Sequence, residues 1–212
     1  MDQQTLSRTR QALHGVAELV LAGPQYAESQ EIRLRVTPGG FGTVTTPDLR
    51  VERLDLVSAA ARLPLAGTFA DLARGAGVQA RALRDVYADG PGVSPGDTVW
   101  VDPDAAGAIL HAFATGDTAL RELAPDVQPV LWPEHFDVGI SLAEVNYGVS
   151  PGDARIPEPY AYVGPWTLRD GDFWNQPFGA ARRMAEAIDV QAVVAFFREG
   201  ARRASADPPA AP

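Results

Sequence analysis

The chain of 212 residues contains no cysteine and no lysine, and these two absences exclude much of enzyme chemistry. Without cysteine there can be no disulfide, no thiolate zinc site, no iron–sulfur cluster and no cysteine nucleophile. Without lysine there can be no Schiff-base chemistry and no phosphate-binding loop of the Walker type. Histidine is scarce as well, so proton transfer would depend on three histidines, 27 carboxylates, and tyrosine and hydroxyl groups.

Long apolar runs and an excess of basic residues are also absent. No apolar run approaches the roughly 20 residues that a membrane helix needs. The first residues lack the apolar core of a signal peptide, so we expect a cytoplasmic protein with no membrane partner. The net charge of −9 argues against nucleic acid as a partner, because phosphate binding requires a basic face. The sequence leaves open whether this acidic protein is an enzyme and whether it forms a homo-oligomer.

Hydrophobic periodicity predicts a single α+β domain over residues 1–204, followed by a disordered C-terminal tail over 205–212. Helical spacing predicts helices over 5–22, 68–78, 103–123 and 189–204, the first of them ended by Gly23-Pro24. Alternating or β-branched runs predict strands over 31–36, 49–57, 98–102, 127–145 and 159–166. These elements predict a curved antiparallel sheet of about five to seven strands, flanked by three or four helices.

The glycine-rich segment PGGFGT, residues 38–43, has the composition of a phosphate-binding loop. Such loops bind phosphate through backbone amides at the start of a helix, and many carry a lysine. Here a strand-like segment follows, and no lysine is present. We therefore expect a mobile hairpin tip.

Residues 131–140, LWPEHFDVGI, place an acid, an imidazole and a second acid in an otherwise apolar run interrupted by Pro133. Side chains alternate along a strand, so His135 and Asp137 are expected on one face, with Glu134 on the other face beside Trp132 and Phe136. A carboxylate two positions from a histidine can orient the imidazole as a general base or a metal ligand. Three residues are therefore candidate catalytic residues: His135, Asp137 and Glu134.

Polar and aromatic residues before and after this segment predict a pocket for a small molecule. Tyr160 and Tyr162 share one face of the predicted strand 159–166. Aromatic walls with a few convergent polar groups are typical of ligand pockets. Tyrosine also favours strands in general, so packing at the rim of the sheet is the competing interpretation. The predicted ligand-binding residues are Asn146, Tyr160, Tyr162 and Trp132.

A metal site is predicted from a second pair of donors in the first helix. His14 and Glu18 are four positions apart and lie on one helical face. If this helix packs across the strand that carries His135 and Asp137, the four side chains converge and could hold a divalent metal, zinc or iron. The competing interpretation is structural, because a histidine beside an apolar face is usually hydrogen-bonded to its neighbours and no HExxH-type motif is present.

Four segments together resemble a family of uncharacterised actinobacterial proteins with a WPEHFD motif. They are LHGVAELVLAGPQY at 13–26, IRLRVTPGGFGT at 32–43, LWPEHFDVGI at 131–140 and NYGVSPGDARIPEPYAYVGPW at 146–166. More faintly, the chain is similar to a broader domain of unknown function that begins with a histidine-bearing helix and a β-hairpin. The resemblance spans residues 11–200 and is most specific at WPEHFD. It implies one domain and no particular activity.

Two functions are compatible with these features. In the first, the protein is a small-molecule enzyme or ligand-binding protein that uses acid–base or metal-assisted chemistry in a pocket around His135. In the second, it is a non-catalytic interaction or scaffold protein in which WPEHFD is a structural corner, with Pro133 bending the strand and Trp132 filling the core. A pocket at His135 would favour the first function, and an exposed aromatic patch would favour the second.

Overall fold

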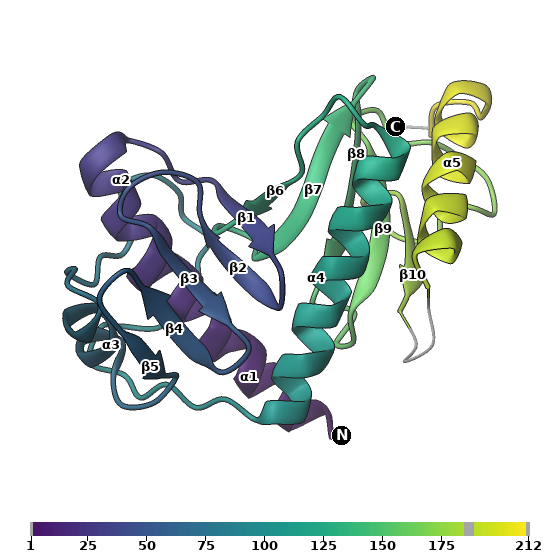
Figure 1. The fold of residues 1–212 in the computed structure, drawn as a ribbon. Helices are drawn as coiled ribbons and strands as arrows, with labels where there is room; N and C mark the ends of the chain where they lie inside the picture. Colours follow the sequence, from purple (N-terminus) through teal and green to yellow (C-terminus); the bar gives the residue numbers. More distant parts are fainter. Residues whose placement is uncertain (1, 185–188, 211–212) are drawn as a thin grey trace.

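Ten short strands form one continuous antiparallel sheet in the computed structural model, which describes residues 2–184 and 189–210 (Figure 1). The strands are β1 (Leu34–Thr37), β2 (Gly40–Thr43), β3 (Leu49–Glu52), β4 (Asp55–Ser58), β5 (Arg62–Pro64), β6 (Val130–Trp132), β7 (Asp137–Leu142), β8 (Val145–Ser150), β9 (Tyr160–Pro165) and β10 (Ala180–Arg183). The predicted class, α+β with an antiparallel sheet, is confirmed. The predicted number of strands, about five to seven, is too low.

The sheet consists of two five-stranded meanders. Strands β1–β5 are neighbours in chain order, and so are β6–β10. The two meanders meet where β1 pairs with β6, and within the described residues this joint consists of one registered pair, Leu34 opposite Leu131. The outer edges of the sheet are β5, which ends in Pro64, and β10, which ends in Arg182 and Arg183. A long helix precedes each meander, so the order of helix and meander occurs twice.

Four helical segments accompany the sheet within the described ranges. They are a continuous first helix made of α1 (Gln3–Gly15), η1 (Val16–Ala22) and α2 (Gly23–Ser29), followed by α3 (Phe69–Gly75), α4 (Pro103–Leu123) and α5 (Val190–Ala206). The side chains of Thr68, Asp102 and Asp189 accept backbone N–H groups at the starts of α3, α4 and α5, and these helices begin within one residue of the predicted starts. None of the described helices combines the length and the apolar character that a membrane crossing demands.

The first helix does not end at Gly23-Pro24, as predicted; it continues to Ser29 through the wider, π-helical segment η1. In a π-helix each carbonyl accepts from the residue five positions on, so Pro24 leaves the carbonyl of Leu19 without a donor from the helix. The N–H of Arg81 donates to this carbonyl at 2.9 Å. Gly23 permits the approach, since a Cβ there would lie 1.9 Å from the Arg81 carbonyl oxygen. A neighbouring segment thus replaces the hydrogen bond that proline removes.

The prediction of a mobile hairpin tip at residues 38–43 is wrong. Most of this segment forms strand β2, which is buried along its whole length. Its glycines let β3 approach closely. A Cβ on Gly40 would lie 1.9 Å from the carbonyl oxygen of Val51, and one on Gly42 would lie 2.7 Å from that of Leu49. Between them, Phe41 is fully buried. The glycines therefore serve strand packing, not loop mobility.

Two further predicted segments differ from the structure. Residues 98–102 form no strand, and Thr98 makes only an isolated bridge to Thr68. Helix α5 continues to Ala206, and the N–H of Ala210 donates to the carbonyl of Leu168 at 2.8 Å. The first two residues of the predicted tail are therefore helical, its disorder beyond Ala206 stays a prediction, and residues 211–212 lie outside the described residues.

Helices α4 and α5 pack on one face of the second meander (Figure 1). Gly116 of α4 lies against Val138 and Val149, where a Cβ would come within 2.8 Å of the Val149 side chain. Gly200 of α5 lies in the same way against Val163. Side chains alternate along β7, β8 and β9, so the residues directly before and after each of these valines point to the opposite face of the sheet. We call this opposite face the groove face.

An aromatic cluster joins the two meanders to the long helices. The ring of Phe136 contacts Phe113 of α4 and Phe41 of β2 edge to face, with centroids 5.1 and 5.5 Å apart. On its other side, Phe136 stacks on His14 of α1 at 5.2 Å. Phe136 is 1% exposed, whereas Trp132 is 36% exposed. Phe136 therefore fills the core, and the proposal that Trp132 does so is wrong.

Substituting these two aromatic residues should therefore have unequal effects. Phe136→Ala removes a ring buried between three aromatic neighbours and should lower the free energy of unfolding by about 3–5 kcal/mol. Trp132→Ala should cost less than about 2 kcal/mol, because its ring is partly in solvent. Urea unfolding followed by circular dichroism measures both. Equal losses in the two variants would contradict the assignment of Phe136 as the core residue.

Candidate functional site

The segment WPEHFD is a hairpin loop, not one interrupted strand. Strand β6 ends at Trp132, residues 133–136 form the loop, and β7 begins at Asp137. The N–H of Phe136 donates to the carbonyl of Trp132 at 2.8 Å, and Phe136 adopts a left-handed conformation with φ of +52°. Nε2 of His14 donates to the carbonyl of Pro133 at 2.6 Å. The loop is therefore fixed from the helix side, and it leaves Asp137, the first residue of β7, on the groove face.

The groove face carries a cavity of about 660 Å³ that continues into a second one of about 510 Å³; we call the two together the groove. The lining of the larger cavity includes His135, Asp137, Asn146, Tyr160 and Tyr162. The lining of the smaller one includes Trp132 and Glu134. All the residues predicted to be catalytic or ligand-binding thus line one groove. Trp132 lies opposite Asp137 in the β6–β7 pair, so these two share a face, contrary to the prediction.

Asp137 is a carboxylate with an incomplete set of hydrogen bonds at the floor of the groove. It is 7% exposed, and the hydroxyl of Tyr162 donates to its Oδ2. Its Oδ1 has no hydrogen-bond partner among the described residues. Burial raises the pKa of Asp137. The Tyr162 hydrogen bond and the charge of His135 lower this pKa, but by less, so the net shift is upward. The pKa of Tyr162 is raised by burial and by the Asp137 charge, so its hydroxyl stays a donor.

Two glycines form the surface on which the ring of Tyr162 lies. Gly148 is opposite Tyr162 in the β8–β9 pair, and a Cβ on it would lie 2.4 Å from the tyrosine hydroxyl oxygen. A Cβ on Gly139 of β7 would lie 3.0 Å from the same oxygen. A side chain at either position would lift the ring from the sheet. Tyr162 therefore reaches across β8 to Asp137 on β7 because both positions are glycine.

Asp153 also lines the groove, although it was not among the predicted site residues. Its Oδ2 accepts from the hydroxyl of Tyr160 at 2.7 Å, and its Oδ1 accepts from the N–H groups of Arg155 and Ile156 at 2.6 and 2.7 Å. Burial alone would raise the pKa of Asp153, but these hydrogen bonds outweigh it and lower the pKa. Aspartate after Pro-Gly often binds turn N–H groups in this way, so the motif predicts a structural role.

Asn146 lies in the groove beside an exposed indole. Its Oδ1 accepts from the hydroxyl of Ser141 at 2.7 Å and from Nε1 of Trp166 at 3.2 Å. Both bonds use the oxygen, so the amide NH₂ group is available to solvent or a ligand. The side chain of Trp166 is 65% exposed and forms part of the groove lining.

The structure does not assemble the predicted metal set of His14, Glu18, His135 and Asp137. No group of three or more metal donors among the described residues includes His14, Glu18 or Asp137. His14 instead binds Pro133 and stacks on Phe136, and burial lowers its pKa to about 4. The physical reason is that α1 packs on the core side of the loop, whereas Asp137 points to the groove face.

Glu18 supports a neighbouring loop from inside the protein. It is 4% exposed, and its Oε1 accepts a long hydrogen bond, 3.5 Å, from the N–H of Leu83. A Cβ on Gly90 would lie 2.8 Å from its Oε2, so the loop passes directly over the carboxylate. Burial raises the pKa of Glu18.

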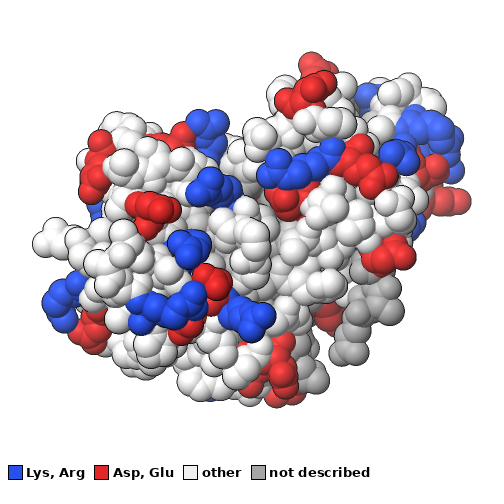
Figure 2. Space-filling view, in the orientation of Figure 1, with Lys and Arg blue, Asp and Glu red and all other residues white. Residues whose placement is uncertain are grey.

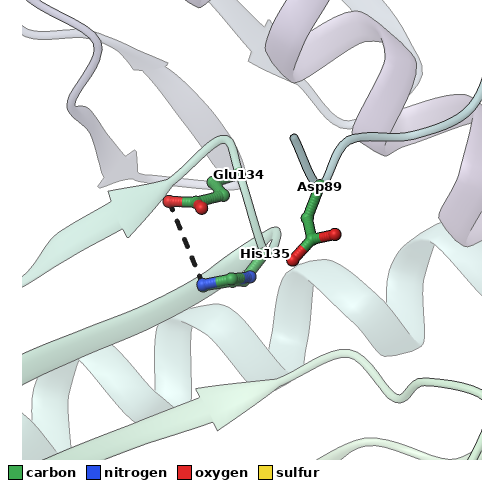
Figure 3. Close-up of side chains that lie close together, drawn as sticks. All are labelled: Asp89, Glu134 and His135. Atoms are coloured by element: carbon green, nitrogen blue, oxygen red, sulfur yellow. Dashed lines mark ion pairs between the residues drawn. The ribbon is translucent and has the colours of Figure 1, made fainter. Parts of the chain in front are cut away.

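A different group of donors lies on the outer side of the hairpin loop. One donor atom from each of Asp89, Glu134 and His135 lies within 4.8 Å of the other two, and no other such group of three occurs among the described residues. In Figure 3 the imidazole lies between the two carboxylates. Nε2 of His135 is 3.9 Å from Oε2 of Glu134. Asp89 comes from the loop before α4, and no sequence motif connects it to WPEHFD.

Comparison with family models, with curated proteins and with solved structures finds no match to this chain. The resemblance to an actinobacterial family and to a domain of unknown function therefore stays a prediction. Support for a function comes from the site itself.

Tyr162 and Asp137 should be energetically coupled. Tyr162→Phe leaves both carboxyl oxygens of Asp137 without a donor and should lower the free energy of unfolding by about 1–3 kcal/mol. A double-mutant cycle with Asp137→Ala, measured by urea unfolding, should give a coupling energy of about 1–2 kcal/mol. Tyr26→Phe removes a hydroxyl from a half-buried tyrosine outside the groove and serves as control. Additive effects of the two substitutions would refute the pairing.

His14 should make stability depend on pH. Its pKa is about 4 in the folded protein and about 6.5 when unfolded, so the folded state binds fewer protons between these values. Stability is therefore complete above about pH 6.5 and falls, by about 2–3 kcal/mol, as the pH drops to about 4. His14→Gln keeps a donor for the Pro133 carbonyl and does not titrate. Urea unfolding from pH 7.5 to 4 should show a shrinking difference between the two proteins, and parallel profiles would contradict this assignment.

Proposed function

We propose that this protein binds a small molecule in the groove, with Asp137 and Tyr162 as the polar pair at its floor. The observation that carries the proposal is the unpartnered Oδ1 of Asp137, buried in a groove with aromatic walls. A buried carboxyl oxygen without a partner costs stability by about 1–3 kcal/mol, and such groups are concentrated at functional sites. A ligand that donates to this oxygen would remove the cost.

The lining of the groove indicates the chemistry of the ligand. Tyr160, Phe178 and Trp166 supply aromatic surface, which suits a ring or a flat apolar group. Asp137 accepts hydrogen bonds, and Asn146 can donate them. A volume of about 660 Å³ is within the range of small-molecule sites. The best-fitting ligand is therefore a ring-bearing alcohol or amine whose O–H or N–H contacts Asp137. Catalysis by His135, Asp137 and Glu134 stays a prediction.

Interaction with another protein is the second candidate function. Trp132, Leu168 and Trp166 are exposed by 36%, 47% and 65%, and all three line the groove. Exposed aromatic side chains are also typical of protein interfaces. On the face shown in Figure 2 acidic and basic side chains are interspersed, so this face offers no continuous basic surface to nucleic acid. The absence of a nucleic-acid partner stays a prediction.

Ligand binding can be tested with a library of ring-bearing alcohols and amines, observed by saturation-transfer NMR. Compounds that bind the native protein should bind Asp137→Asn and Tyr162→Phe about tenfold or more weakly, because a hydrogen bond to a charged group contributes about 1.5–3 kcal/mol. Asp117→Asn, on α4 and outside the groove lining, should not change binding. Equal binding to all variants would reject the groove as the site. Self-association that Trp166→Ala abolishes, seen by light scattering, would support the second function.

A further inference from the structure

We propose that Asp89, Glu134 and His135 bind a divalent first-row transition metal ion, with zinc as the best fit, at the edge of the groove. These three side chains offer one imidazole nitrogen and two carboxylate oxygens within 4.8 Å of one another. Catalytic zinc sites use three protein ligands of these types and keep a further position open. Magnesium and calcium prefer larger sets of oxygen ligands, so one imidazole with two carboxylates favours a transition metal.

The geometry needs only a small closing movement. Donor atoms around a tetrahedral zinc ion lie roughly 3.4 Å apart. The donor atoms of these three residues lie within 4.8 Å of one another, so the longest separation would have to shorten by at most about 1.4 Å. The side chain of His135 is 59% exposed and that of Glu134 is 32% exposed, so both can rotate without disturbing the core. Figure 3 shows the Asp89 carboxylate directed toward the imidazole and the Glu134 carboxylate beside it.

The charges of the group lack a cation. Neither Asp89 nor Glu134 has an arginine within 4 Å among the described residues, and Nε2 of His135 lies 3.9 Å from Oε2 of Glu134. Many other carboxylates are paired with arginine, for example Glu52 with Arg62 at 2.9 Å. Two carboxylates and a neutral imidazole match the charge of a divalent ion.

A second observation connects the group to the groove. Asp137 lines the same cavity as Glu134 and His135, it is 7% exposed, and its Oδ1 has no partner among the described residues. Carboxylates next to a metal site commonly accept hydrogen bonds from a metal-bound water or ligand. A water or ligand atom in the open position of the ion would supply the donor that Asp137 lacks.

The loop that carries Asp89 is anchored on both sides. Before it, the N–H of Leu83 donates to Glu18. After it, Gly90 packs against the same carboxylate, and Nε2 of Gln11 donates to the carbonyl of Pro91 at 3.2 Å. The backbone at Asp89 is thus tied to the first helix, which also holds the WPEHFD loop through His14. One helix therefore sets the relative position of all three donors, although it supplies no ligand.

The test is a zinc titration of metal-stripped protein against a chromophoric chelator, with cobalt(II) absorption as a second readout. The native protein should bind one zinc ion per chain. Asp89→Asn, Glu134→Gln and His135→Gln should each weaken binding about tenfold or more, as loss of a ligand does. Matched controls are Asp85→Asn, from the same loop, and His111→Gln, an exposed histidine of α4. These two should bind zinc as the native protein does.

The cobalt(II) complex should show visible absorption bands with the high intensity that is typical of tetrahedral coordination. These bands should change in the three ligand variants. All five substitutions affect exposed or partly exposed side chains, and thermal unfolding will confirm that each variant folds. Equal zinc affinity in native protein and His135→Gln, or an equal loss in His111→Gln, would overturn the proposal. The metal site does not depend on the proposed function. Zinc is titrated without small molecules, and small-molecule binding is measured in excess chelator, so the two can fail separately.

Discussion

The left-handed backbone conformation of Phe136 is the constraint on which both the core and the groove face depend. It directs the Phe136 ring into the core between α1, α4 and β2, and it starts β7 with Asp137 on the groove face. A bulky residue in this conformation costs about 1–3 kcal/mol. Burial of the ring contributes about 1.5–3 kcal/mol and offsets that cost. Core packing and groove chemistry are therefore linked through one peptide unit, and relaxation of the loop would displace Asp137 together with Phe136.

The part of the site that can be predicted from the sequence is the part that strand geometry controls. Alternation along β9 places Tyr160 and Tyr162 on one face, because side-chain direction depends only on neighbours in the same strand. Alternation does not reveal which face a helix covers, so the convergence of His14 with Asp137 was predicted wrongly. Asp89 reaches its position through a loop held by contacts between distant segments. Periodicity contains no information about such contacts.

The fold divides in the same way between local and distant causes. The helix starts at Thr68, Asp102 and Asp189 were predictable, because a cap involves residues within one turn. The continuation of the first helix past Pro24 was not predictable, because the N–H that replaces the missing proline donor comes from Arg81. Strand β2 was missed for a similar reason, since its glycines look like turn residues until β3 packs against them. The short strands β5 and β10 contain too few residues to show a clear alternation.

The two edges of the sheet have a consequence for aggregation. An antiparallel sheet with exposed edges can add a strand from another molecule and grow without limit. Here Pro64 at the end of β5 has no N–H to donate to an added strand, and Arg182 and Arg183 place two charges at the end of β10. Both edges thus oppose polymerisation. Self-association of this protein would then have to bury a face of the molecule, and such a contact closes as a dimer where both copies use the same face.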